Sequence, residues 1–114
     1  MKKQTWTQEF PAAITICNAD GVIIEMNEAA AKVFANDGGA QLVGKNALDC
    51  HPEPSRSKMR EMLEKPAVNA YTIEKNGQKK LIYQCPWYEN NEFRGIVELS
   101  FPIPDQMPHF VRPS

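Results

Sequence analysis

A short stretch near the N-terminus constrains the fold more than any other part of the sequence. Residues 12–17 and 22–26 are two apolar runs, and Asp20-Gly21 between them tolerates the positive φ angles of a tight turn. Asn27 stands directly before the alanine-rich residues 28–34, where its side-chain oxygen can accept a free backbone N–H of a first helical turn. The stretch therefore predicts a β-hairpin that leads through a helix cap into a helix.

The size and charge of the chain limit its possible functions. With 114 residues, 42% of them hydrophobic, it can form one domain with a single core and a hollow of modest size. Its 13 basic and 14 acidic side chains give a formal net charge of −1, so no overall field attracts nucleic acid or an anionic membrane. We therefore expect the protein to bind neither nucleic acid nor a membrane.

Targeting signals and cysteine usage point to the cytoplasm. No apolar run approaches the roughly 20 residues of a membrane span, and no signal-peptide core follows the first residues. Cys17, Cys50 and Cys85 form an odd set without paired spacing, so we expect no structural disulfide. A cytoplasmic location is expected.

The rest of the chain adds short helices and then three strands. Glycines at 38 and 39 stop the first helix, and a helix capped by Ser55 is expected after Pro52 and Pro54. Residues 71–74, 79–88 and 93–101 are typical of strands joined by hairpins. The order predicts an α+β fold with an antiparallel sheet, because hairpins need no helical crossover.

The motif Asp20-Gly21-x-Ile23-x-x-x-Asn27-x-Ala29-Ala30 resembles the opening of a PAS domain. The resemblance covers about residues 12–103, and Pro86 and Gly95 stand where the family often has these residue types. It implies the PAS fold, a five-stranded antiparallel sheet in the order 2-1-5-4-3 with short helices covering one face. Residues 1–11 are then an N-terminal flank, a helix or an arm, 12–103 the PAS domain, and 104–114 a Pro-rich C-terminal tail.

Cys50-His51-Pro52 is the only constellation that suggests chemistry. Thiolate and imidazole bind zinc or haem iron, and some PAS domains bind haem through a histidine on the long helix beside the pocket. His51 precedes Pro52 and so belongs to the loop before that helix. The favoured interpretation is a histidine bonded to a loop carbonyl and a packed thiol, with Cys50 and His51 as weak metal candidates. The triplet also resembles one found in a subgroup of bacterial PAS domains.

Covalent flavin chemistry and catalysis are not expected. In light-sensing PAS domains a cysteine follows Gly-x-Asn, whereas here Ala47 follows Gly44-Lys45-Asn46, although a noncovalent flavin stays open. Acidic residues fall on polar helix faces or in loops, and no general acid and base pair is visible. We therefore do not expect the protein to be an enzyme.

The strand pattern nominates residues that line a ligand pocket. In residues 93–101 the apolar side chains alternate with Arg94, Glu98 and Ser100, so Val97 and Leu99 are expected to face the helices. Alignment with the family pattern turns Ile82 and Gln84 inward, where Gln84 either orients a ligand or bonds a backbone group. The candidate pocket residues are Phe34, Leu42, His51, Met59, Met62, Leu63, Ile82, Gln84, Val97 and Leu99.

The same register leaves a second apolar row on the outside of the sheet. It contains Leu81, Tyr83, Cys85 and Trp87, a poor face for solvent. PAS domains commonly dimerise with an N-terminal helix over this surface, so the resemblance implies a homodimer. The candidate interface residues are Trp6, Phe10, Leu81, Tyr83 and Trp87. The alternative is that the flank folds back on its own sheet.

The leading hypothesis is a bacterial-type PAS sensor module without catalysis, which binds a small ligand in its cup and relays occupancy through the sheet face by protein–protein contact. The alternative is a PAS-fold dimerisation module whose core is filled by Met59, Met62, Leu63 and Phe34. A third class is a haem or metal sensor that uses His51. The sequence specifies neither the ligand, nor a cofactor, nor the output protein partner.

Overall fold

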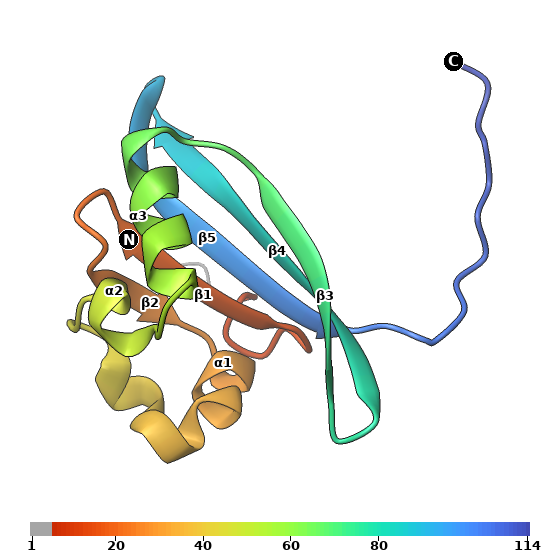
Figure 1. Cartoon of the computed structure of the whole chain (residues 1–114), viewed down its shortest axis with the longest axis horizontal. Coiled ribbons are helices and arrows are strands. Elements are labelled where there is room, and N and C mark those ends of the chain that lie inside the picture. Colours follow the sequence, from red (N-terminus) through yellow and green to blue (C-terminus); the bar gives the residue numbers. More distant parts are fainter. Residues whose placement is uncertain (1–5) are drawn as a thin grey trace.

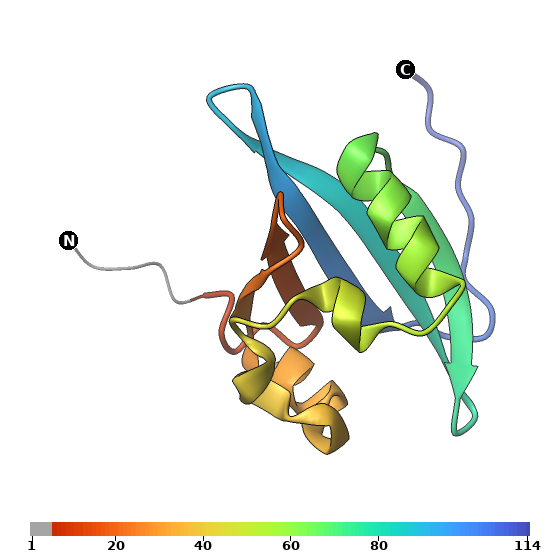
Figure 2. The same ribbon diagram turned by 60° about the vertical axis from the view of Figure 1, so that its left-hand side comes forward.

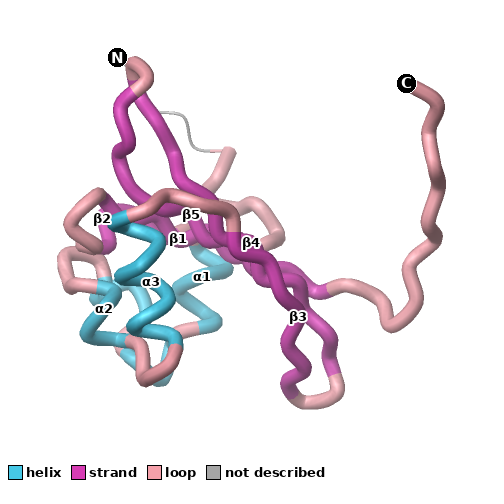
Figure 3. Tube along the Cα trace, turned by 45° about the horizontal axis from the view of Figure 1, so that its top comes forward, coloured by secondary structure: helices cyan, strands magenta, loops and turns pink. Residues whose placement is uncertain are grey.

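The computed structural model describes residues 6–114, which form one sheet with helices on one of its faces. The strands pair antiparallel in the order β2-β1-β5-β4-β3, as predicted (Figure 1). Figures 2 and 3 show the helices gathered on the same side of the sheet. In chain order the elements are β1 Ala13–Asn18, β2 Ile23–Met26, α1 Glu28–Val33, the 3-10 helices η1 Ala35–Asp37 and η2 Gly39–Leu42, α2 Ala47–Cys50, α3 Ser55–Glu64, β3 Asn69–Lys75, β4 Gln78–Glu89 and β5 Glu92–Pro102.

The first hairpin and helix form where the sequence predicts them. The Asn18 side chain accepts from the backbone N–H groups of Asp20 and Val22, both at 3.0 Å, and Gly21 has φ +87°. Asn27 precedes α1, and its Oδ1 accepts from Ala30 N at 3.0 Å. The expected helix cap at Asn27 is therefore confirmed.

The start of α3 differs from the expectation. Ser55 is the first helical residue, Pro54 holds the cap position, and no side chain caps the helix from there. Instead, the Glu53 carboxylate accepts from Ser57 N at 2.9 Å and from Ser57 Oγ at 2.8 Å. Proline is favoured just before or at the first turn because its fixed φ suits a helix start, and Glu53 then satisfies a free N–H.

Both later hairpins turn through two residues in the left-handed region. Asn76 and Gly77 have φ +53° and +78°, and Asn90 and Asn91 have +54° and +65°. These angles match the right-handed twist of the flanking strands. Both hairpin turns therefore lie where the sequence predicts them.

A β-bulge in the β4–β5 hairpin reverses the expected facing of β5. Tyr88 pairs with Phe93, but Trp87 pairs with Gly95, so Arg94 is the extra residue. A one-residue shift moves every later side chain to the other face of the sheet. Val97 and Leu99 therefore pair with Cys85 and Tyr83, and the expectation that they face the helices is wrong. Ile96, 5% exposed, is the β5 residue that packs under α3.

The core lies between the helices and the inner face of the sheet, in two clusters. One cluster centres on Ala13, Met26 and Ala30, and a second joins Cys17, Met62 and Ile96. Among the described residues, no large side chain is less than 2% exposed. The core side chains leave space between the helices and the sheet.

The two terminal segments contain no helix or strand. Residues 6–11 form turns rather than a helix, with Phe10 N donating to Thr7 O at 3.3 Å. Beyond β5 the chain is extended and exposed up to its C-terminus (Figure 1). The thiols of Cys17, Cys50 and Cys85 are free. In the part of the chain that the structure describes, no helix is long and apolar enough to span a membrane.

Candidate ligand cavity

A cavity of about 700 Å³ lies between the inner face of the sheet and the helices. Strands β1, β2, β4 and β5 line it on one side, and residues 34–52 and α3 line it on the other. Most of the lining side chains are apolar, as in sites that bind small amphipathic molecules. Six of the ten candidate pocket residues line it: Phe34, Leu42, His51, Met59, Met62 and Gln84.

The other four candidates lie elsewhere. Ile82 lines a smaller cavity of about 210 Å³, to which Phe34 and His51 also contribute. Leu63 packs against the cluster that contains Met62. Val97 and Leu99 line neither cavity, because the bulge turns them to the opposite face.

A row of three polar side chains crosses the inner face of the sheet. Asn69 pairs with Gln84 across β3–β4, and Gln84 pairs with Glu98 across β4–β5. Asn69 Nδ2 donates to Gln84 Oε1 at 2.9 Å, and Gln84 Nε2 donates to Glu98 Oε2 at 2.9 Å. Gln84 thus bonds two side chains, not the backbone group considered from the sequence. We call Asn69, Gln84 and Glu98 the polar ladder.

Sequence reasoning missed two members of this ladder. The alternation of residues 93–101 alone puts Glu98 on the face away from the helices, because it does not reveal the bulge, and Asn69 lies before residue 71, the predicted start of its strand. A sequence signal exists only for Gln84, a single polar residue in an apolar strand. Glu98 becomes its neighbour once the extra residue, Arg94, is counted.

His51 enters the cavity from the end of α2. Its Nδ1 lies 2.7 Å from the carbonyl oxygen of Ala47. A carbonyl only accepts, so this bond assigns the proton to Nδ1 and leaves Nε2 as an acceptor in the neutral ring. The carbonyl belongs to α2 rather than to a loop. Cys50 is exposed, not packed, and its Sγ lies 3.6 Å from Asn46 O.

The charge of the Glu98 carboxylate acts on groups to either side. Burial raises the pKa of the Cys17 thiol, the Ile96 backbone opposes this, and the negative charge of Glu98 adds to the rise. Burial, and then Glu98, also raises the pKa of Tyr71. Among residues 6–114, no group of three or more histidine, cysteine or acidic side chains is arranged to hold a metal ion.

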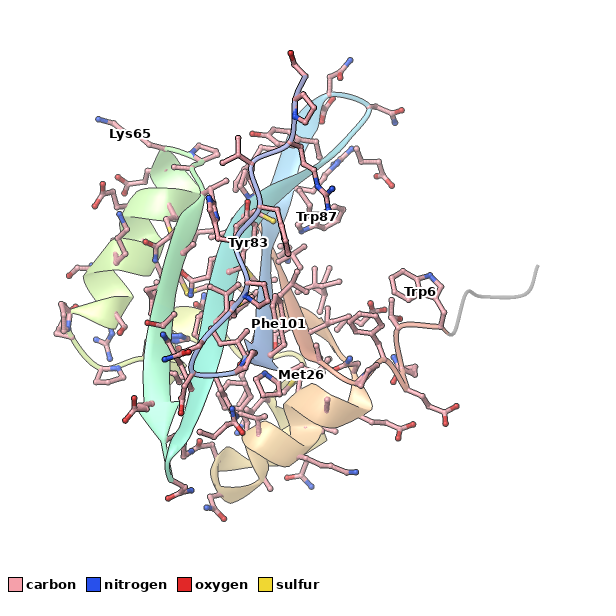
Figure 4. The ribbon with its side chains drawn as sticks, turned by 90° about the vertical axis from the view of Figure 1, so that its right-hand side faces the viewer. Trp6, Met26, Lys65, Tyr83, Trp87 and Phe101 are labelled. Atoms are coloured by element: carbon pink, nitrogen blue, oxygen red, sulfur yellow. The ribbon has the colours of Figure 1, made fainter. Side chains whose placement is uncertain are left out.

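The outer face of the sheet is apolar from β1 to β4. Leu81, Tyr83, Cys85 and Trp87 lie there as predicted, and all four are half-buried. Pairing brings Val97, Leu99 and Phe101 of β5 beside them, and Ile14 and Ile16 of β1 beyond. We call these nine residues the outer sheet face. Tyr83, Trp87 and Phe101 are labelled on it in Figure 4.

The described part of the N-terminal flank lies beside this face rather than over its centre. Trp6 and Phe10 pack edge to face with ring centroids 5.8 Å apart, but they are 63% and 41% exposed. Figure 4 shows Trp6 to one side, away from Tyr83. The flank is held by Asn27, whose Nδ2 donates to Thr7 O at 2.9 Å. The two candidate interface aromatics of the flank therefore remain open to solvent.

Comparison with known proteins agrees with this architecture. The family model described as PAS fold matches residues 7–77, more than half of the chain, and the chain therefore belongs to the PAS family. PAS domains are typical of sensor and signalling proteins. No curated protein matches the chain.

Solved structures with the same fold come from several organisms. The PAS domain of Bordetella pertussis BvgS is 16% identical with a TM-score of 0.62, over 88% of this chain and 82% of that one. A C-terminal domain from Streptococcus mutans is 20% identical with a TM-score of 0.64, over 84% and 78%. The Vibrio cholerae Aer2 receptor, described as a dual PAS-heme oxygen sensor, is 18% identical with a TM-score of 0.59, over 82% and 95%. These likenesses show the fold.

Proposed function

We propose that this chain is a non-catalytic sensor module that binds a small ligand in its cavity and relays occupancy through the outer sheet face. The observation that carries the proposal is the cavity of about 700 Å³, lined mainly by apolar side chains together with Gln84 and Glu98 of the polar ladder. An apolar enclosure with a few fixed polar groups is the usual construction of a ligand site. The ladder runs across three strands, so a ligand that contacts it also contacts the sheet whose other side is the proposed relay surface.

Ligand binding is tested by native and denaturing mass spectrometry of the protein purified under mild conditions. We expect a retained small molecule that is released on denaturation. NMR titration with the released compound should shift resonances of residues that line the cavity, such as Thr15, Gln84 and Ile96. A protein with no retained compound, and with no cavity resonance that responds to any small molecule, would contradict the proposal.

The relay surface is proposed to bind a second copy of the chain. Eight of the nine residues of the outer sheet face are half-buried and Ile14 is buried, and exposed Trp6 and Phe10 lie beside this face. Burying large apolar side chains contributes roughly 1.5 to 3 kcal/mol each, so several of them together can exceed the cost of association. Sedimentation of Tyr83→Glu should show monomers where the unmodified protein is dimeric. Tyr88→Glu is the control, since Tyr88 lies at the hairpin end and is 56% exposed.

Two other functions are distinguished by the same preparations. A dimerisation module with a filled core would sediment as a dimer and retain no ligand; Met62, 2% exposed, and Met59 already fill part of the space beside Ile96. A haem sensor would bind iron through Nε2 of His51, the nitrogen opposite the one bonded to Ala47. Haem would give a coloured protein, and His51→Ala would remove the colour.

A further inference from the structure

The Glu98 carboxylate faces the cavity without a cationic partner. Glu98 is half-buried and lines both cavities. In the described part of the chain no lysine or arginine forms an ion pair with it, and Arg94 of the same strand pairs instead with Glu89 and Glu92, at 3.7 and 3.6 Å. A carboxylate removed from water is costly unless a donor or cation compensates it. One donor, Gln84, is present.

The polar ladder fixes how this carboxylate is presented. Asn69 donates to Gln84 Oε1, which turns the NH₂ group of Gln84 toward Glu98. This orientation of the Gln84 amide suits an ionised carboxylate, which can only accept hydrogen bonds. Gln84 engages Oε2, and Oε1 of Glu98 forms no hydrogen bond to any described residue. Asn69 and Gln84 are thus positioning residues for a carboxylate that retains a free acceptor atom.

The other polar groups around the main cavity favour a cation. Its remaining charged lining residues are Asp37, Asp49 and Lys45, so with Glu98 the acidic groups outnumber the basic one. The hydrogen bond from His51 Nδ1 to Ala47 O leaves Nε2 as a second acceptor when the ring is neutral. Lys75 and Lys80 line the smaller cavity together with Glu98, but neither is ion-paired with it.

We infer that the cavity selects a cationic amphipathic ligand, a small molecule with an apolar body and a protonated amine that donates to Glu98. The apolar body would lie against the side chains of Met26, Met59, Met62 and Ile96, which line the same cavity. A charge-assisted hydrogen bond inside an apolar enclosure is about twice as strong as a neutral one, so the carboxylate supplies selectivity among ligands of one shape. This inference rests on the proposed ligand-binding function.

The test uses probes that share a body and differ in the headgroup. Tryptamine, tryptophol and indole-3-acetate are titrated by NMR into the full chain, and the three headgroups are repeated on phenyl and octyl bodies. We expect the amine of at least one body to bind at least tenfold more tightly than its alcohol, and the acid to bind most weakly. In Glu98→Gln the amine should bind no more tightly than the alcohol.

Two further variants make the result specific. Glu74→Gln removes the same charge from an exposed position on β3 that lines neither cavity, and it should keep the preference for the amine. Glu98→Asp keeps the charge and should keep the preference at reduced affinity, which covers the case in which Glu98→Gln does not fold. Equal binding of amine and alcohol to the unmodified protein, tighter binding of the acid, or no binding of any amine would overturn the inference. Alcohols or acids that bind in the cavity would still leave the proposed function standing.

Discussion

The indole nitrogen of Trp87 donates a hydrogen bond to the main-chain carbonyl of Cys17 at 3.1 Å, across the strand that separates them. Trp87 belongs to β4 and Cys17 to β1, and Gly95 of β5 lies between them as the pairing partner of Trp87. A Cβ atom on Gly95 would overlap the Cys17 carbonyl, and Gly95 has φ +149°. The glycine therefore permits the close approach of β1 and the passage of the indole over β5.

Trp87→Phe should lower the free energy of unfolding through loss of this hydrogen bond. The expected change is about 1 to 3 kcal/mol, because the carbonyl of buried Cys17 loses its indole donor while most of the ring packing is kept. Urea denaturation measures the change. Trp6→Phe is the control, since Trp6 is 63% exposed. Equal stability of the Trp87 variant and the control would show that the bond contributes nothing.

Substitutions at two adjacent positions test which side chains of β5 point toward the helices. Ile96→Asp places a carboxylate in the core against Met62 and Cys17 and should unfold the domain, because an unpaired buried charge costs several kcal/mol against a total stability of about 5 to 15. Val97→Asp lies on the half-buried outer sheet face and should leave a folded protein with a lower melting temperature. Circular dichroism melting compares the two. The reverse order would show that the bulge is absent.

The bulge explains what the sequence could and could not predict about the sheet. Alternating residues divide a strand into two faces, and the turn at Asn90-Asn91 sets the pairing for a regular hairpin. Without a bulge, Gln84 would pair with Val97. Because paired residues lie on the same face of a sheet, an inward-facing Gln84 then predicts an inward-facing Val97. Arg94 is the inserted residue. Gly95 is the only residue in this stretch whose type indicates a bulge. The topology, the position of β5 and the two faces of β4 could therefore be predicted, but which β5 side chains face the helices could not.

The sequence could predict the parts of the candidate site that lie on helices and on β4. Met59 and Met62 share one face of α3, as their helical spacing predicts, and both line the cavity together with Phe34 at the end of α1. Glu98 was not predictable from hydropathy, because here the face that lines the cavity is more polar than the face turned to the outside. A domain with a hollow relaxes the rule that apolar side chains face the core.

Asn27→Ala should be strongly destabilising. The side chain is 3% exposed; its Oδ1 accepts from Ile14 N at 2.9 Å and Ala30 N at 3.0 Å, and its Nδ2 donates to Ala12 O at 2.8 Å. Removing it leaves buried backbone groups unpaired at about 1 to 3 kcal/mol each. Chemical denaturation should show a loss several times that of Asn36→Ala, an exposed control. Similar losses for both variants would contradict this role of Asn27.

The three thiols should react at very different rates. Cys50 is exposed, Cys85 half-buried, and Cys17 buried with a pKa raised by burial, which lowers the fraction of reactive thiolate. Labelling with iodoacetamide under native conditions, followed by peptide mass spectrometry, should modify Cys50 first and Cys17 last. In denaturant the three rates should converge. Rapid native labelling of Cys17 would show that the core opens readily.

The carboxylate before α3 should make stability depend on pH. Hydrogen bonds from the Ser57 side chain and then its backbone N–H hold the pKa of Glu53 below its ordinary value. A pKa lowered by folding contributes stability above the unfolded pKa, and that contribution is lost as pH falls through the folded pKa. Glu53→Ala should therefore be less stable than the unmodified protein near neutral pH, and the difference should shrink as the medium is acidified below about pH 4. Glu64→Ala, an exposed position at the far end of the same helix, is the control in urea denaturation at both pH values. If the deficit of Glu53→Ala is the same at both pH values, the Glu53–Ser57 bonds do not favour the ionised carboxylate.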